Sequence, residues 1–420
     1  MIDVSCHSRM FKSRMTNGMI TVEQADKIIL ENCKEFPIVE KPLQQTLGAV
    51  LREDIKADRD IPSFNKALMD GIAISFSSYA KGQRCFFIQG TQAAGQKAIN
   101  FKDKGNCVEI MTGAIIPQGC DCVIPIEDVE IKDREAFIKE NILVRSLQNI
   151  RLEGADNKKG NVLLKKGKML SSVDIGICSY VGKSLVKVSY TPQVAIISTG
   201  NELVDIDVRK LEPFQIRQSN AYALQAAFEA TRLFQSKLFH IKDNKKVLTE
   251  KIAAILKKFD VVVLSGGVSM GKFDYVPEVL KDLGVKVLFH KVAQKPGKPF
   301  WFGRTRDQKL VFALPGNPIS TLVCAYRYVI PALQKALGIK EKKEEWAILN
   351  SDFKSSTNWT LFLPVKMLPN KAGQVLVEPA IFSGSGDLAA LGETDGFIEL
   401  PRGEKQFKER FVAKFFRWTS

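Results

Sequence analysis

The sequence predicts a multidomain α/β protein with a doubly wound parallel sheet domain, an inserted β-rich domain, a mixed linking domain and a C-terminal β-domain. Three observations predict this organisation. Residues 193–337 alternate short β-branched runs with stretches of helical apolar spacing. Residues 63–150 hold short strand-like runs separated by Gly-containing turns. The chain has 420 residues, enough for roughly two to four domains.

The first part of the chain changes character at about residue 19. Residues 1–18 are polar and aperiodic, so we expect a disordered tail or sequence upstream of the true start. Thr21 and Gln24 have the spacing of a capping box and predict a helix over residues 22–33. Residues 41–58 favour a second helix or a helix–strand pair.

The linking domain is expected to be discontinuous. Residues 19–60 and 150–190 would form it, with a helix at residues 171–181, and residues 61–149 would be the inserted β-rich domain. Its strands are predicted at 71–76, 85–89, 106–111, 122–125, 136–138 and 142–144.

The doubly wound domain is predicted at residues 191–338, and residues 339–420 would form the C-terminal β-domain. Residues 259–264 form a β-branched run typical of a buried parallel strand. Ser265, Gly266 and Gly267 end this run, and helical spacing follows. Glycine lets backbone N–H groups approach a phosphate, and a helix start favours negative charge. This loop therefore predicts binding of a phosphate-bearing ligand.

Two more loops follow strand-like runs in the same domain. The segment 295–299 places Lys295 and Lys298 among prolines and a glycine, a rigid cationic arrangement suited to an oxyanion. The segment 314–320 opens a helix, and Thr199 and Gly200 follow the first strand of the domain. Carboxyl ends of parallel strands meet at one sheet edge, where ligands bind in such folds. We therefore expect one anionic ligand site there.

Asp274 stands at the entrance of the helix that follows the glycine loop. An aspartate in this position is either an N-cap or a carboxylate for metal and phosphate chemistry. The residues alone favour the N-cap by roughly 70:30. The neighbouring dibasic loop shifts the balance toward a ligand site.

The amino-acid composition of the chain bears on whether it binds nucleic acid, a metal or a membrane. Lys and Arg exceed Asp and Glu by 61 to 46, which gives a net charge of +15. The basic residues are spread along the chain without a long basic tail or nucleic-acid motif, so a solvated surface is the better interpretation and no nucleic-acid partner is expected. The 8 cysteines show no metal-site spacing. Without a membrane-length apolar run or signal-peptide core, we expect no membrane association and a cytoplasmic location.

Seven short motifs, taken together, resemble the molybdopterin molybdenumtransferase family, which includes the C-terminal domain of gephyrin. They occur in the family's order between about residues 21 and 400. They are Phe64 with Met69-Asp70-Gly71 and Ala73; Met111-Thr112-Gly113-Ala114; Ser198-Thr199-Gly200 with Glu202-Leu203; Ser265-Gly266-Gly267-Val268-Ser269 with Gly271 and Asp274-Tyr275; Lys295-Pro296-Gly297-Lys298-Pro299; Pro315-Gly316-Asn317-Pro318 with Ser320; and Ser383-Gly384-Ser385-Gly386-Asp387-Leu388.

This resemblance implies an enzyme of molybdenum cofactor biosynthesis that inserts molybdate into adenylylated molybdopterin and releases AMP. It implies a Mg²⁺-dependent homodimer whose sites are shared between subunits, acting with other proteins of that pathway. Lys295, Lys298, Ser320 and Ser385 would hold molybdate, and Asp274 and Glu202 would lie near the pterin and a Mg²⁺ ion. Gly266 and Gly267 would cradle the pterin phosphate.

The resemblance assigns further residues. Asp70, Thr112 and Asp156 would come from the other subunit, with Asp70 and Asp156 joining Asp274, Lys295 and Lys298 as catalytic residues. Further substrate-binding positions would be Thr199, Gly200, Ser265, Ser269, Pro299, Pro315, Gly316 and Asn317.

The chain departs from the family pattern at several positions. Asn65, Ala67 and Ala155 replace polar or charged residues, and Trp359 stands where many members carry a molybdate-binding arginine. These substitutions favour a second hypothesis, a non-catalytic paralogue that serves as a scaffold or binds a partner. Intact Asp274, Lys295 and Lys298 favour the enzyme.

Overall fold

The computed structural model describes residues 18–268, 274–340 and 344–419, and these form two compact units. The first unit comprises the described residues up to Glu53, the segment Gly167–Ser171 and the described residues from Leu185 onward. The second comprises Asp54–Lys166 and Ser172–Ser184. The predicted tail, residues 1–18, lies almost entirely outside the described residues.

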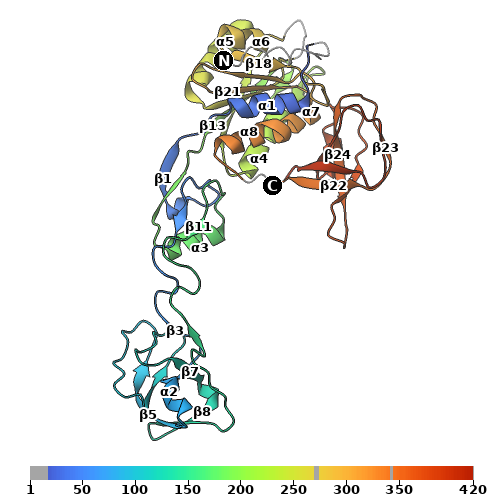
Figure 1. Cartoon of the computed structure of the whole chain (residues 1–420). Coiled ribbons are helices and arrows are strands. Elements are labelled where there is room, and N and C mark those ends of the chain that lie inside the picture. The colour runs from blue at the N-terminus through green and yellow to red at the C-terminus, as the bar shows by residue number, and fades with distance from the viewer. Residues whose placement is uncertain (1–17, 269–273, 341–343, 420) are drawn as a thin grey trace, which may run out of the picture. The chain divides into compact units, whose positions relative to one another are not determined.

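A six-stranded sheet forms the centre of the first unit (Figure 1). Its strand order is β16 (Gln235–Ile241), β13 (Gln193–Thr199), β17 (Val261–Ser265), β21 (Leu310–Leu314), β20 (Trp301–Arg304) and β18 (Lys286–His290). The first four are parallel, whereas β20 is antiparallel to both β21 and β18. The sequence analysis missed β20. Because β18 has the same direction as β21, its carboxyl end still lies at the expected edge.

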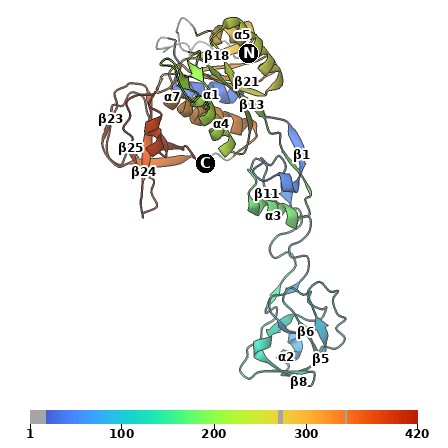
Figure 2. The ribbon, with the colours of Figure 1, turned by 180° about the vertical axis from the view of Figure 1, so that it is seen from behind.

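Both faces of this sheet are buried, which is why its strands are continuously apolar. Along β13, Val194 and Ile196 join one apolar cluster while Ala195 and Ile197 join the other. This alternation follows from the two-residue period of a strand. Figures 1 and 2 show helices on both sides of the sheet. One face carries α1 (Val22–Asn32), α4 (Asn220–Ala230), α7 (Pro318–Cys324) and α8 (Ile330–Ala336), and the other carries α5 (Lys245–Lys258) and α6 (Val276–Asp282). The doubly wound prediction is confirmed.

Helix α1 begins where its capping box predicts. The Thr21 hydroxyl accepts from the Gln24 backbone N–H at 3.2 Å, and the Gln24 side chain accepts from the Thr21 N–H at 2.9 Å. The two bonds satisfy donors that a helix start leaves free. A π-helical turn, η4 (Ala325–Val329), lies between α7 and α8.

The C-terminal domain is a closed sheet. Strands β24, β25, β22, β28 and β26 pair in that order, and β26 pairs back with β24. They span Thr360–Leu368, Leu376–Pro379, Glu345–Leu349, Val412–Arg417 and Gly396–Leu400. The short strand β19 (Gln294–Lys295) joins this sheet beside β24. Phe362 and Phe397 from this domain pack into the apolar cluster of the helices.

The second unit contains a six-stranded sheet, as the inserted β-rich domain requires. Its order is β7 (Cys122–Pro125), β4 (Gly71–Ile74), β6 (Asn106–Ile110), β5 (Cys85–Gln92), β9 (Glu135–Ile138) and β8 (Val129–Lys132). Strand β8 was missed, and residues 142–144, predicted as a strand, are irregular. The same unit contains helices α2 (Phe76–Ala80) and α3 (Ser172–Tyr180).

Most linking segments are extended, and α3 confirms the helix predicted at residues 171–181. Strand β1 (Ile38–Pro42) pairs with β12 (Leu185–Ser189) in the first unit. Residues 41–58 form no α-helix, so the expectation of a second helix is wrong; of the alternative helix–strand pair, only the short 3₁₀ helix η2 (Leu43–Gln45) and the two-residue strand β2 (Ile55–Lys56) are present. The remaining short elements are β3 (Lys66–Ala67), η3 (Ile126–Asp128), β10 (Ile150–Arg151), β11 (Val162–Leu164), β14 (Leu203–Val204), β15 (Ile216–Arg217), β23 (Phe353–Lys354), η5 (Ala389–Glu393) and β27 (Gln406–Phe407). Among the described residues, no helix has the length and apolar character needed to cross a membrane.

Candidate functional site

A cavity of about 1320 Å³ lies at the carboxyl edge of the six-stranded sheet of the first unit. The loops that follow β13, β17, β18 and β21 line it, together with residues of the C-terminal domain. Most residues that the sequence analysis assigned to the ligand site meet there: Thr199, Glu202, Ser265, Gly266, Gly267, Asp274, Lys295, Lys298, Pro299, Pro315, Gly316, Asn317, Ser320 and Ser385. Parallel strands thus bring together loops from distant parts of the chain.

The glycine loop is packed tightly against the end of β13. A Cβ atom on Gly266 would lie 2.9 Å from the Thr199 carbonyl oxygen, and one on Gly267 would lie 2.8 Å from the Thr199 Oγ1. Both glycines have positive φ, 96° and 66°, which disfavours other residues. Thr199 is 4% exposed, and its Oγ1 has no hydrogen-bond partner among the described residues. Glycine at both positions is therefore what lets this loop pack against the end of β13.

Three carboxylates approach one another at the cavity. Burial raises the pKa of Asp243 above its ordinary value, and the negative charges of Glu202 and Asp274 raise it further. All three residues line the cavity. The Asp243 Oδ1 atom is buried without a hydrogen-bond partner in the described part of the chain. A cation bound here would relieve both the repulsion and the missing contact.

Asp274 is not the N-cap of α6. That position belongs to Tyr275, whose side chain makes no capping hydrogen bond. The N-cap interpretation of Asp274 is therefore wrong, and its carboxylate lines the cavity instead.

The residues present fit a Mg²⁺ ion bound partly by substrate. Mg²⁺ in proteins is commonly held by one or two carboxylates, substrate phosphate oxygens and water. No three His, Cys, Asp or Glu side chains in the described ranges cluster closely enough to hold a metal ion by themselves. The Glu202, Asp243 and Asp274 group, with the orphaned Asp243 oxygen, matches a site that phosphate oxygens complete.

Lys295 and Lys298, here called the clamp lysines, both contact the C-terminal domain. The Lys295 Nζ donates to the Ser356 Oγ at 3.3 Å. The Lys298 Nζ lies 5.3 Å from the centroid of the Trp359 ring, within cation–π range. Both partners line the cavity. Trp359 thus supplies a π face to Lys298.

Hydroxyl groups and amides line the part of the cavity near α7. The Asn317 Nδ2 donates to the Ser385 Oγ at 2.8 Å, and the Ile319 N–H donates to the Ser385 carbonyl at 3.1 Å. These bonds tie the serine loop of the C-terminal domain to the start of α7. Ser320 is 3% exposed and also lines the cavity. Two serines, Ser320 and Ser385, are therefore brought to one cavity from different domains.

The remaining predicted residues lie elsewhere. Gly200 is not among the residues lining the cavity, although a Cβ on it would lie 2.7 Å from a Glu202 carboxylate oxygen. Ser269 lies outside the described residues. Asp70, Thr112 and Asp156 belong to the second unit.

The carboxylates of the second unit have their own partners. The Asp70 Oδ1 accepts from the Thr112 N–H at 2.7 Å and from its hydroxyl at 2.8 Å, and these bonds lower the pKa of Asp70. The Asp156 Oδ1 accepts from the Arg151 Nε at 2.8 Å. Both carboxylates are exposed and held in fixed positions.

Sequence reasoning missed Asp243 and Asn220. Asp243 lies two residues beyond the end of β16, so its position after a strand was the signal that could have found it. Asn220 begins α4, and its Nδ2 donates to the Ser265 Oγ at 2.9 Å and to the Gly316 carbonyl at 2.7 Å. No local pattern indicates that second role, because its partners are distant in sequence.

Comparison with known proteins places the chain in a family. Residues 20–182 match the MoeA N-terminal region (domain I and II), residues 195–335 a probable molybdopterin binding domain, and residues 347–409 the MoeA C-terminal region (domain IV). A molybdopterin molybdenumtransferase of Synechocystis sp. is 37% identical over 401 residues, which cover 95% of this chain and 100% of the relative. The chain belongs to the molybdopterin molybdenumtransferase family.

Other relatives agree across the full length. The Staphylococcus epidermidis protein of the same name is 34% identical over 396 residues, 93% of each chain. A solved Pyrococcus MoeA structure has a TM-score of 0.83 at 31% identity, and covers 96% of this chain and 100% of its own. A second, from Pyrococcus horikoshii, has a TM-score of 0.79 at 26% identity over 95% and 100%. The predicted resemblance is confirmed.

Proposed function

We propose that this chain is a transferase of molybdenum cofactor biosynthesis that inserts molybdate into adenylylated molybdopterin and releases AMP. The observation that carries the proposal is the cavity of the first unit, where two lysines, two serines, a glycine loop and three carboxylates converge. The substrates are a tetrahedral oxyanion and a pterin with phosphate groups. The chain's similarity to transferases over their full length supports this chemistry.

The lysines and serines are assigned to the oxyanion. Lys295 and Lys298 supply positive charge in a partly sheltered cavity, where charge-assisted hydrogen bonds are stronger than in water. Ser320 and Ser385 orient the molybdate oxygens with their hydroxyls. The Asn317 amide keeps Ser385 in place through the 2.8 Å hydrogen bond.

The glycine loop and the carboxylates are assigned to the phosphate groups. The loop at Gly266 and Gly267 lines the cavity and is assigned to the pterin phosphate, because successive backbone N–H groups in such loops bind anions. Glu202, Asp243 and Asp274 would hold Mg²⁺ together with phosphate oxygens. When bound, that ion supplies positive charge that neutralises the phosphates.

The finer assignments are also proposals. We propose a cytoplasmic homodimer in which Asp70, Thr112 and Asp156 serve the site of the other subunit, and which works with other proteins of the pathway. Asp70 suits this role because Thr112 holds it ionised at the surface. The predicted domain limits at residues 61, 150, 191 and 339 belong to the same proposal.

The scaffold hypothesis is the weaker one. It rested on the substitutions at Asn65, Ala67, Ala155 and Trp359. Asn65 keeps a structural role, since its Oδ1 accepts from the Glu153 N–H at 2.8 Å. Trp359 lies beside Lys298 at the cavity. These contacts, together with the transferase names of the relatives, favour the enzyme.

The test is AMP release by the purified protein with adenylylated molybdopterin, molybdate and Mg²⁺. We expect AMP formation that depends on molybdate and falls when Lys298 is replaced by Ala. A matched control is Lys366→Ala, which removes an exposed lysine of the C-terminal domain that pairs with Glu393 and is not among the cavity-lining residues. No AMP release from folded wild-type protein, or equal loss in both variants, contradicts the proposal.

A further inference from the structure

The loop that carries Lys295 and Lys298 is hydrogen-bonded to one buried side chain, that of Gln294. Gln294 is fully buried, and its Nε2 donates to the carbonyls of Pro296 and Gly297, each at 3.2 Å. Proline supplies no backbone donor, so this loop has few hydrogen bonds of its own. The side-chain amide thus satisfies two successive loop carbonyls that lie between the two lysines.

The glycine at the centre of the loop permits this contact. Gly297 has a φ of 95°, and a Cβ on it would lie 2.6 Å from the Gln294 Nε2 and 2.8 Å from the Cys324 Sγ. Any other residue would displace the amide from beneath the loop. The loop and Gln294 therefore fit one another in a single arrangement.

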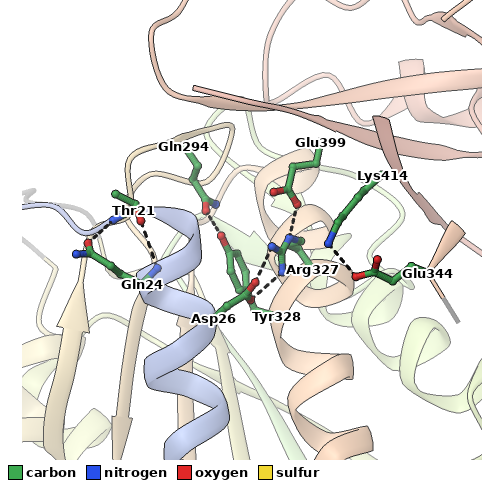
Figure 3. Close-up of polar contacts among 9 residues, drawn as sticks. All are labelled: Thr21, Gln24, Asp26, Gln294, Arg327, Tyr328, Glu344, Glu399 and Lys414. Carbon is green, nitrogen blue, oxygen red and sulfur yellow. Dashed lines mark hydrogen bonds and ion pairs between the residues drawn. The ribbon is translucent and has the colours of Figure 1, made fainter. Parts of the chain in front are cut away.

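Tyr328 fixes which way the amide faces. Its hydroxyl donates to the Gln294 Oε1, which leaves the Nε2 toward the loop carbonyls (Figure 3). Tyr328 is 1% exposed and comes from the π-helical turn η4. Burial raises the pKa of Tyr328 well above its ordinary value, so the phenol stays a donor. An amide that turned over would place its oxygen against two carbonyls.

Arg327, the residue before Tyr328, anchors the same turn to two other elements. It donates to both carboxylate oxygens of Asp26 on α1, each at 2.7 Å, and to Glu399 on β26 at 2.7 Å (Figure 3). The Arg327 side chain is 7% exposed. A buried ion pair of this kind holds one geometry, because moving any member leaves a charge unpaired. The turn that presents Tyr328 is therefore immobilised by α1 and by the C-terminal domain.

We propose that Gln294 and Tyr328 are positioning residues that preform the oxyanion clamp by fixing the Pro296–Gly297 backbone between Lys295 and Lys298. The proposal rests on the proposed function for the identity of the anion. Neither side chain needs to touch substrate. Their effect is to remove the cost of ordering two cationic side chains and their loop when the oxyanion binds.

The decisive variant is Tyr328→Phe, with Tyr326→Phe as its matched control. Tyr326 lies in the same π-helical turn, and its hydroxyl donates to the Trp418 carbonyl instead of the loop system. Each variant removes one phenol hydrogen bond and keeps the ring. Gln294→Met is the stronger perturbation, and if it fails to fold, Tyr328→Phe carries the test alone.

Two measurements distinguish a positioning role of Tyr328 from a general effect of the substitution on protein stability. We expect Tyr328→Phe to speed hydrogen–deuterium exchange in residues 293–300 and to raise the KM for molybdate by roughly 2–10-fold. The KM for adenylylated molybdopterin should change less than about 2-fold, since its assigned contacts come from other loops. Tyr326→Phe should leave both the loop exchange and the molybdate KM near wild type, even if its Tm falls equally.

The outcomes are distinguishable from failure of the proposed function. Unchanged loop exchange in Tyr328→Phe, or equal changes in both tyrosine variants, overturns the positioning role. Faster loop exchange without a higher molybdate KM in an active enzyme overturns the clamp. If wild-type protein releases no AMP, the proposed function fails, and a loop that stays ordered in Tyr328→Phe then overturns this inference as well.

Discussion

The cavity of the first unit and the Asp70–Thr112 pair of the second unit place carboxylates in opposite situations. At the cavity, burial and two like charges raise the pKa of Asp243, and its Oδ1 has no hydrogen-bond partner among the described residues. In the second unit, two hydrogen bonds from Thr112 lower the pKa of Asp70, which is exposed. Ionised Asp243 destabilises the folded state when no cation is bound beside it. The hydrogen bonds of Asp70, in contrast, already stabilise its ionised form.

This difference indicates different tasks. Groups that repel one another in a cavity are typical of a site that binds a counter-charge, since perturbed carboxylates concentrate at functional sites. A satisfied exposed carboxylate is typical of a surface that presents a fixed negative charge. If the proposed function is right, the first binds metal and phosphate and the second complements a site from another subunit. Five predictions test this contrast.

The largest effect is expected from Asp274→Asn. Because Tyr275 is the N-cap, the amide should leave α6 folded while removing a charge from the carboxylate group. AMP release should fall by on the order of 10²-fold or more. Asp282→Asn is the control, since it removes an exposed carboxylate of the same helix that pairs with Lys245. Normal turnover by folded Asp274→Asn would exclude the metal role.

Complementation tests the shared site. Asp70→Ala and Lys295→Ala should each be nearly inactive, because each removes one half of a composite site. Co-expressed and randomly mixed, the two should recover about a quarter of wild-type activity, since some heterodimers carry one intact site. Tagged pull-down must establish mixing. Mixed heterodimers without activity would refute sharing between subunits.

A smaller effect is expected at Trp359. Trp359→Leu removes the π face beneath Lys298 and should raise the molybdate concentration for half-maximal activity by about 2–5-fold. Trp346→Leu is the matched control, because Lys414 lies over that ring at 5.7 Å and Trp346 is not among the cavity-lining residues. Equal effects of both variants would rule out a specific role.

Trp359→Arg tests whether an added positive charge strengthens molybdate binding. It adds the positive charge that the family resemblance implies at this position, so it should lower the molybdate concentration for half-maximal activity and hardly change affinity for the adenylylated pterin. If the folded Arg variant needs as much molybdate as wild type, the missing cation does not limit binding here.

The smallest effect concerns stability and distinguishes the two carboxylates by sign. The raised pKa of Asp243 means that its ionisation disfavours the folded state at neutral pH. Asp243→Asn without Mg²⁺ should therefore raise Tm by about 1–2 °C, and the gain should vanish as pH falls below the ordinary Asp range. The lowered pKa of Asp70 predicts the reverse for Asp70→Asn, a loss of Tm at neutral pH that disappears in acid. Thermal unfolding from about pH 2 to pH 8 covers the range in which Asp ionises and measures both effects, and equal signs would contradict the comparison.

Local sequence patterns were sufficient to predict several helices and strands. The capping box at Thr21 and Gln24 determined where α1 begins, because its two hydrogen bonds join residues three apart. The apolar run ending at Ser265 determined a strand buried on both faces. Since carboxyl ends of parallel strands meet at one edge, alternation alone brought the glycine loop and the clamp lysines to one predicted site.

Other features had no local signal. Nothing in the run at residues 301–304 specifies that β20 runs antiparallel, because direction is set by how the chain returns to the sheet. Residues 142–144 have strand-like composition, yet no neighbouring strand is positioned to pair with them in the structure.

Most of the strands and helices, the sheet edge at which the ligand site lies and the residue types of its loops could therefore be predicted from the sequence. Only the tertiary structure decided that Asp243 joins Glu202 and Asp274, that Trp359 faces Lys298, and that Tyr328 reaches Gln294. The two kinds of feature differ because their interactions join residues at different separations along the chain. Capping, alternation and turn formation act between residues a few positions apart, whereas these contacts join segments that only folding brings within a few ångströms.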